Sequence, residues 1–145
     1  LLTGPHRPPA SPMLEYTVQA RRLDAHGSAV SAKEAVLQVD TDPQGRADAL
    51  NPAELLLASL AACIIKGAER VLPTLGFRLA GLEVRLHAVR QDSPPKILAI
   101  DYVITVDTDE PDHRIELLHT NIRKYGTISN TLALAVPIDG SIRRR

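Results

Sequence analysis

Apolar and polar residues alternate in two short stretches of the N-terminal third, and this period of two predicts strands. Residues 14–21 place apolar side chains on one face and polar side chains on the other, as a half-buried strand does. Residues 26–28 have the composition of a turn, and residues 35–39 repeat the alternation. The Asp-, Pro- and Gly-rich residues 40–50 are expected to form a loop.

A long apolar segment follows this loop and predicts a helix. Residues 55–65 contain one polar residue, Ser59, so the helix is apolar nearly all round and is expected to be central. Asn51 is a good N-cap, and Glu54 falls three residues later, as in a capping box. The helix is expected to span residues 52–72. Pro52 suits the first helical position, and Pro73 marks the end.

The second half combines long alternating stretches with a second helical pattern. Residues 82–88 and 98–106 flank a proline-containing break and predict an antiparallel hairpin. The sequence Asp-Glu-Pro at 109–111 opens a helix that Gly126 ends. A short helix and a last strand are expected at 127–135 and 136–142. This order of elements predicts an α+β fold with helices packed on antiparallel sheet.

Composition changes this interpretation little, but it narrows the classes of function. Seventeen basic and seventeen acidic residues cancel, and aromatic residues are 3% of the chain, so we expect neither nucleic acid nor a membrane surface as a partner. No apolar run approaches the roughly 20 residues of a membrane span. With one cysteine no internal disulfide can form, and we expect a cytoplasmic protein.

The 145 residues are enough for one domain with a real core. Residues 1–12 hold four prolines and no initiator methionine, so we expect a disordered or expression-derived extension there and a single domain over 13–145. The five histidines show no metal-ligand spacing, and no phosphate-binding glycine loop is present. We therefore expect no metal and no cofactor.

The only cysteine, Cys63, lies on the apolar helix. A thiol there is either inert packing or a protected nucleophile. Free cysteine is among the most buried residue types, which favours packing.

Two motifs resemble a known family. Residues 51–63, Asn-Pro-Ala-Glu-Leu-Leu-Leu-Ala-Ser-Leu-Ala-Ala-Cys, are similar to the central helix of the OsmC/Ohr family of osmotically induced and organic-hydroperoxide-resistance proteins. That family's pattern is roughly Asn-Pro-Glu-x-Leu, seven residues, then Cys. Residues 126–132, Gly-Thr-Ile-Ser-Asn-Thr-Leu, resemble its Cys-Pro-x-Ser-Asn-x-Leu segment. The order of elements agrees with the family from about residue 13 to 142.

The resemblance implies an OsmC-like fold, with antiparallel sheets packed on a long central helix in an intertwined homodimer. Active sites would lie at the subunit interface. A pair of cysteines would reduce hydroperoxides and be regenerated by a dithiol.

Carried over residue by residue, the resemblance makes Cys63 the peroxidatic cysteine and puts Gly126 at the position of the resolving cysteine. The acid that follows Asn-Pro in the peroxidases is Ala53 here, and Glu54 is a weak substitute one position later. The family's arginine from the N-terminal strands would be Arg22, which continues the apolar face of its strand, rather than its neighbour on the polar face.

Three further residues have two interpretations each. Ser59 either hydrogen-bonds the sulfur of Cys63 or, as is more common, bonds back to the helix backbone. Lys66 either favours the thiolate or is a solvated charge. Ser129 either lines the site or caps a helix, and the cap is the favoured interpretation.

Two functions remain open at this stage, and with them whether the protein is an enzyme. The first is a one-cysteine, thiol-dependent peroxidase of the oxidative stress response, using Cys63, a hydroperoxide and an external thiol. The second is a non-catalytic OsmC-like dimer that binds a small apolar or thiol-reactive ligand. Replacement of the resolving cysteine by Gly126 and of the acid by Ala53 favours the second, and retention of Cys63 favours the first.

Overall fold

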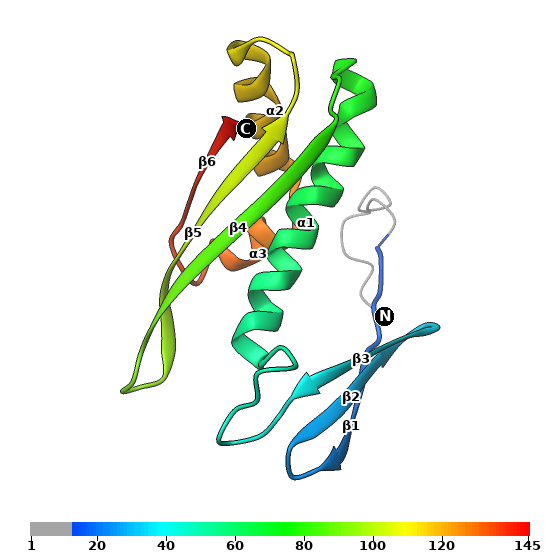
Figure 1. The fold of residues 1–145 in the computed structure, drawn as a ribbon, viewed down its shortest axis with the longest axis vertical. Coiled ribbons are helices and arrows are strands. Elements are labelled where there is room, and N and C mark those ends of the chain that lie inside the picture. The colour runs from blue at the N-terminus through cyan, green and yellow to red at the C-terminus, as the bar shows by residue number, and fades with distance from the viewer. Residues whose placement is uncertain (1–12) are drawn as a thin grey trace, which may run out of the picture. The chain divides into compact units, whose positions relative to one another are not determined.

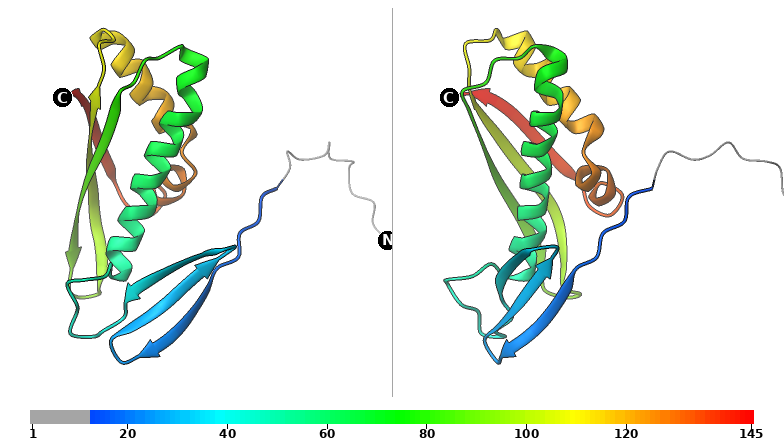
Figure 2. Two further views of the ribbon diagram at one scale, coloured as in Figure 1. Left: turned by 45° about the vertical axis from the view of Figure 1, so that its right-hand side comes forward. Right: turned by 90° about the vertical axis from the view of Figure 1, so that its right-hand side faces the viewer.

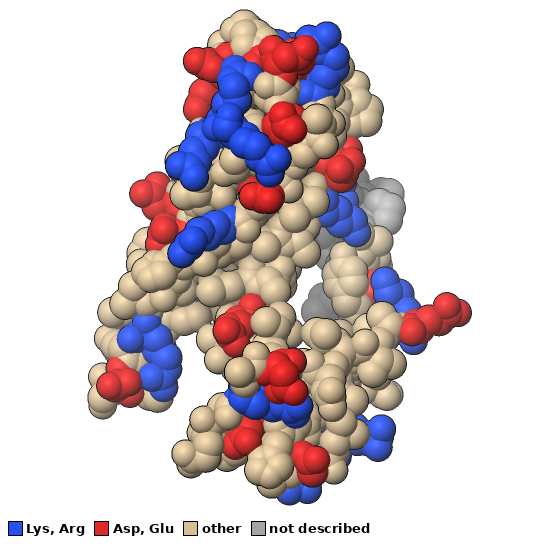
Figure 3. All heavy atoms as spheres, in the orientation of Figure 1, with Lys and Arg blue, Asp and Glu red and all other residues tan. Residues whose placement is uncertain are grey.

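A computed structural model describes residues 13–145, which form two compact units that divide after Pro52 (Figures 1 and 2). The prediction made for residues 1–12 lies outside the described residues. On the face drawn in Figure 3, basic and acidic side chains lie among one another in both units. No helix within residues 13–145 combines the length and the apolarity needed to cross a membrane.

The N-terminal unit is a three-stranded antiparallel sheet in the order β1-β2-β3. Its strands are β1 (Gln19–Asp24), β2 (Gly27–Ala32) and β3 (Ala35–Asp40). The prediction of a strand from residue 14 is wrong, because pairing begins at Gln19 opposite Ser31. The chain of β2 turns at Lys33, which has φ of 57°, so residues 13–18 find no pairing partner there.

The turn predicted at residues 26–28 falls earlier, because Gly27 and Ser28 already belong to β2. The β2 strand itself was not predicted. Its side chains are small, so they give little contrast between apolar and polar positions.

The predicted loop after β3 is confirmed and is held by side chains. Asp40 accepts backbone N–H groups from Asp42 and Arg46, both at 3.0 Å. The Arg46 guanidinium pairs with Asp48, and His26 bonds Asp42 at 2.7 Å.

The C-terminal unit is a three-stranded sheet, β4-β5-β6, with helices packed on it. Its strands are β4 (Gly81–Gln91), β5 (Lys96–Asp107) and β6 (Ile138–Arg144). The predicted antiparallel hairpin of β4 and β5 is confirmed. The last strand, however, runs parallel to β5, because two helices carry the chain back to the other end of the sheet.

The helices are α1 (Pro52–Leu75), α2 (Asp112–Tyr125) and α3 (Thr127–Leu132). α1 is longer than predicted, since Pro73 lies inside its last turn and does not end it. The stop is Gly76, whose φ of 56° lets Phe77 N–H reach the carbonyl of Leu72 at 3.1 Å. α2 ends before Gly126 as predicted, whereas α3 is shorter than the predicted 127–135.

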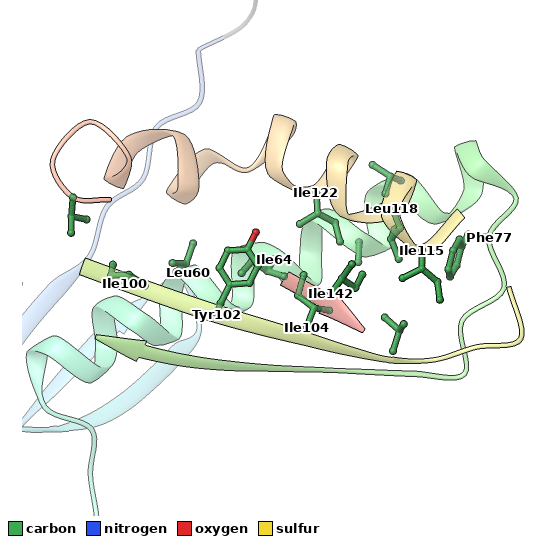
Figure 4. Close-up of a cluster of buried hydrophobic side chains, with 14 residues drawn as sticks. Leu60, Ile64, Phe77, Ile100, Tyr102, Ile104, Ile115, Leu118, Ile122 and Ile142 are labelled. Carbon is green, nitrogen blue, oxygen red and sulfur yellow. The ribbon is translucent and has the colours of Figure 1, made fainter. Parts of the chain in front are cut away.

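The core of this unit lies between the sheet and the helices (Figure 4). Every second residue of β5 from Ile100 to Val106 is buried, and α2 contributes Ile115, Leu118 and Ile122. α1 buries one stripe in this core, consisting of Leu60, Ile64, Ala68 and Val71. The α+β class is confirmed. In α1 itself, Leu56 and Ile65 keep 37% and 41% of their surface exposed.

Candidate functional site

Cys63 lies near the middle of α1, next to the buried Ile64. Its side chain is half-buried, and its sulfur accepts a hydrogen bond from the backbone N–H of Ile128 at 3.5 Å. Ile128 is the second residue of α3, so the helix motif and the C-terminal motif meet at this sulfur. The sequence analysis missed this N–H donor. Every residue except proline has a backbone N–H, so residue type does not show which one bonds the sulfur.

Gly126, at the position of the resolving cysteine, is a crowded place for any side chain. It joins α2 to α3 in an extended conformation and is buried. A Cβ added there would lie 3.0 Å from Ser129 Oγ and 3.4 Å from the carbonyl oxygen of Ile122. The hydroxyl of Ser129 therefore packs against Gly126, and the cap interpretation of Ser129 is wrong because no side-chain hydrogen bond caps α3. Its role in lining the site stays a prediction.

The two polar neighbours of Cys63 on α1 differ in what they contact. Ser59 Oγ donates to the carbonyl oxygen of Leu56 at 2.7 Å, which is the backbone bond that we expected to be more common. Lys66 is exposed, and no ion pair of the described residues includes it. Its effect on the thiol stays a prediction.

Helix geometry separates Glu54 from Cys63. An α-helix turns about 100° and rises about 1.5 Å per residue, so nine positions place Glu54 about 180° around and about 13.5 Å along α1 from Cys63. Ala53, ten positions away, lies only about 80° around. Within one chain, Ala53 is therefore nearer than Glu54 to the side of α1 on which Cys63 lies. A role of Glu54 in the site stays a prediction.

Arg22 belongs to β1 of the N-terminal unit, where it is exposed and pairs with Ser28 in the ladder. It lines a hollow of about 390 Å³ together with Asp24 and Thr41. That Arg22 completes the Cys63 site stays a prediction.

A buried polar pair, Tyr102 and His119, lies in the core of the C-terminal unit. Tyr102 Oη and His119 Nε2 are 2.7 Å apart, and the rings meet edge to face. In Figure 4 the oxygen of Tyr102 points from β5 toward α2. Burial, with the charge of Arg123, lowers the pKa of His119, and burial raises the pKa of Tyr102. The sequence signal for this pair is that both residues stand at apolar-face positions of their elements.

Within residues 13–145, no three His, Cys, Asp or Glu side chains form a group that could hold a metal ion.

The structure defines a class of α+β protein in which a half-buried thiol on a long helix contacts a second motif. Comparison with known proteins identifies this class. The sequence model for OsmC-like proteins matches residues 45–140. The chain therefore belongs to the OsmC-like protein family. Comparison with curated proteins gave no match.

Solved structures share the fold at low sequence identity. The OsmC-like protein from Mycoplasma pneumoniae superposes with a TM-score of 0.83 at 18% identity, over 90% of this chain and 97% of that one. The organic hydroperoxide resistance protein OhrB of Bacillus subtilis gives 0.67 at 19% identity, over 90% and 98%. An organic hydroperoxide resistance protein OsmC from Legionella pneumophila gives 0.68 at 18%, over 91% and 98%.

Proposed function

We propose that this protein is a one-cysteine, thiol-dependent hydroperoxide reductase that acts in the oxidative stress response as a cytoplasmic homodimer. The observation that carries the proposal is the half-buried sulfur of Cys63 with the N–H of Ile128 directed at it. Through this hydrogen bond the helix motif and the C-terminal motif, the two segments that resemble the peroxidases, meet at the one sulfur that would attack the hydroperoxide. Family membership and the hydroperoxide-resistance proteins of the same fold support the proposal.

The proposed reaction has three balanced steps. The thiolate of Cys63 attacks the distal oxygen of the hydroperoxide, the O–O bond breaks, and the alkoxide takes a proton and leaves as an alcohol. Cys63 is thereby oxidised to a sulfenic acid. An external thiol condenses with it to a mixed disulfide and water, and a second thiol releases Cys63 as its own disulfide forms. No cofactor takes part.

The external thiol is needed because Gly126 leaves no second sulfur beside Cys63. The sulfenic acid consequently persists until a small thiol arrives. Excess hydroperoxide would then carry it on to the irreversible sulfinic acid.

A second candidate is a non-catalytic OsmC-like protein that binds a small apolar or thiol-reactive ligand. Gly126 and Ala53, at the positions of the resolving cysteine and the acid, favour it. The side of α1 on which Glu54 lies favours it further, because Glu54 is turned about half a circle from Cys63.

Mass spectrometry separates the two candidates. One equivalent of cumene hydroperoxide, followed by dimedone, should label Cys63 in the wild-type protein and leave the Cys63→Ser control unlabelled. Addition of a monothiol before dimedone should replace the label by a mixed disulfide. If Cys63 stays reduced in millimolar hydroperoxide at pH 8, the peroxidase proposal is refuted and the ligand-binding candidate remains.

An engineered second sulfur tests the geometry around Gly126. Gly126→Cys alone would press its Cβ on the Ser129 side chain, so we expect it to need Ser129→Ala for full stability. The double variant should form an internal disulfide after one equivalent of peroxide if its two Cα atoms lie within about 7 Å. An unchanged yield of mixed disulfide would show that the two positions are too far apart.

A further inference from the structure

A groove of about 330 Å³ runs between the C-terminal half of α1 and the C-terminal half of α2. Its size lies within the range of small-molecule sites. The two helices come close where Gly67 faces Ile122, because a Cβ on Gly67 would lie 3.9 Å from the Ile122 side chain. The lining residues are Gly67, Arg70, Val71, Thr74 and Leu75 of α1 with Asn121 and Tyr125 of α2.

The lining is apolar along α1 and polar at its sides. Val71, which is buried, and Leu75, which is partly buried, are the aliphatic side chains of the lining. Tyr125 adds an aromatic ring that is 53% exposed. The amide of Asn121 donates to the carbonyl oxygen of Leu117 at 2.9 Å. Among residues 13–145, none of those that line the groove is acidic.

Arg70 gives the groove a positive charge without a partner in the described chain. Several other arginines, among them Arg78, Arg114 and Arg144, pair with a carboxylate within 4.0 Å. For Arg70, no carboxylate of residues 13–145 lies within that distance. The ammonium group of Lys124, which does not line the groove, lies 5.3 Å from the centroid of the Tyr125 ring.

We propose that this groove binds an anionic amphiphile, such as a medium-chain carboxylate. The carboxylate pairs with Arg70, which presents the planar fork that suits a carboxylate. The aliphatic part lies over Val71 and Leu75, beside the ring of Tyr125. The proposal rests on the lining of the groove alone, and it holds whether or not Cys63 reacts with hydroperoxides.

The groove also begins close to the thiol. Gly67 is one helical turn after Cys63 and lies about 40° from it around α1. Tyr125 directly precedes Gly126, the first residue of the C-terminal motif at 126–132. A ligand in the groove therefore ends one turn from Cys63, on the side of α1 that carries the sulfur.

A displacement experiment tests the proposal with two matched pairs of molecules. The probes are 1-anilinonaphthalene-8-sulfonate and its uncharged analogue N-phenyl-1-naphthylamine, measured by fluorescence with the full-length Cys63→Ser protein. The competitors are octanoate and 1-octanol, which share a chain and differ in charge. We expect the sulfonate to be the tighter probe and octanoate to displace it at about tenfold lower concentration than octanol, as expected for a charge-assisted pair worth about 1.4 kcal/mol.

Substitutions in the groove locate the site. Arg70→Gln should weaken octanoate about tenfold and leave octanol unchanged, and Arg70→Lys should keep most of the affinity. The control is Arg85→Gln, which removes one charge from an exposed arginine on β4 and should change nothing. Thr74→Trp should fill the groove and weaken both competitors.

Three outcomes would overturn the proposal. Equal competition by octanoate and octanol would show that no anion is recognised. An equal loss in Arg70→Gln and Arg85→Gln would show general charge screening, and full binding in Thr74→Trp would place the probe elsewhere. Dimedone labelling of Cys63 in the wild type is a separate readout, so failure of the peroxidase proposal and failure of this one are distinguishable.

Discussion

At the scale of single residues, Tyr102 depends on the absence of a side chain beside it. Gly140 of β6 pairs with Tyr102 of β5, and a Cβ on Gly140 would overlap the Tyr102 ring. The ring is fixed from its other end, because its hydroxyl bonds His119. A glycine in a strand usually weakens it, and here it provides the space for a buried aromatic ring.

We expect Gly140→Ala to lower the free energy of unfolding by about 2–4 kcal/mol, because the new methyl group must displace Tyr102 from its hydrogen bond. Urea denaturation followed by circular dichroism measures the change. The control is Gly81→Ala in β4, where the added Cβ would make an ordinary contact of 3.6 Å with Asp107. Equal effects of the two substitutions would refute this account of Gly140.

His119 predicts a loss of stability in mild acid. Burial, then the charge of Arg123, lowers the pKa of His119 in the folded protein, and Glu116 opposes this in part. The unfolded chain therefore binds the proton more tightly than the folded one, with an ordinary pKa of 6.5. The contribution of His119 to stability is complete above pH 6.5 and is lost as the pH falls below it toward the folded-state pKa.

The melting temperature of the wild type should accordingly fall between pH 7 and pH 5. In His119→Gln this part of the pH dependence should disappear, although the variant starts from lower stability. His113→Gln, which changes an exposed histidine of the same helix, should keep the wild-type profile. A profile in His119→Gln that runs parallel to the wild type would assign the acid sensitivity to other groups.

At the scale of elements, Arg114 links the end of α1 to the start of α2. Its guanidinium donates to the carbonyl oxygen of Leu75 and pairs with the buried Glu110 at 3.3 Å. Glu110 also accepts the backbone N–H of Arg78 at 3.2 Å. One side chain therefore bonds both a carbonyl group at the α1 C-terminus and a buried carboxylate.

We expect Arg114→Ala to cost about 1–3 kcal/mol, since it leaves a buried carboxylate and a helix-end carbonyl short of a partner. Denaturant unfolding at pH 8 measures it. Arg123→Ala, which shortens an exposed arginine of the same helix, should stay within about 0.5 kcal/mol of the wild type. A loss no larger than that of Arg123→Ala would mean that water replaces the guanidinium.

How far each element could be predicted depends on how local its cause is. α1, α2 and the β4–β5 hairpin have strong periodicity and end signals in their own residues, and they were predicted close to their positions. The start of β1 was misplaced because alternation in residues 14–18 does not supply a neighbouring strand. The parallel direction of β6 was missed because it follows from where α2 and α3 take the chain.

The candidate site divides in the same way. Cys63 and Gly126 could be selected from the sequence, because the two motifs that contain them are defined by residue types. The N–H of Ile128 and the pairing of Tyr102 with His119 arise only when distant segments meet, over 65 and 17 positions of the chain. Residue types alone therefore predicted the thiol, but neither the donor of its hydrogen bond nor the buried pair of Tyr102 and His119.

At the scale of the whole molecule, exposed apolar surface predicts a homodimer. Leu56 and Ile65 of α1 are more than one third exposed, and Val36 of β3 is 73% exposed. Leu56 and Ile65 are nine positions apart, so they lie about 180° apart around α1. A helix with exposed apolar side chains on two sides needs a further covering element. We therefore expect a second copy of the chain to cover the side of α1 that carries Ile65, about 200° around the helix from Gly67 and its groove, as the family resemblance implies.

Sedimentation equilibrium at micromolar concentration should give twice the chain mass of 15.7 kDa. Ile65→Lys should shift the equilibrium toward the monomer, because it places a charge on the surface that we expect to be buried between subunits. A wild type that sediments as a monomer throughout this range would contradict the prediction.

The parallel pairing of β5 with β6 determines the order in which the C-terminal unit can fold. β4 and β5 are adjacent in sequence, so their contacts close a short loop and form early. Ile100 and Ile138, by contrast, are 38 positions apart (138 − 100), so their contact must wait until α2 and α3 have formed or a much longer loop has closed. In pulse-labelled hydrogen exchange, amides of the β4–β5 ladder should therefore gain protection before those of β6. During this interval β5 is an open edge, available to β6 of a neighbouring chain as well as to its own.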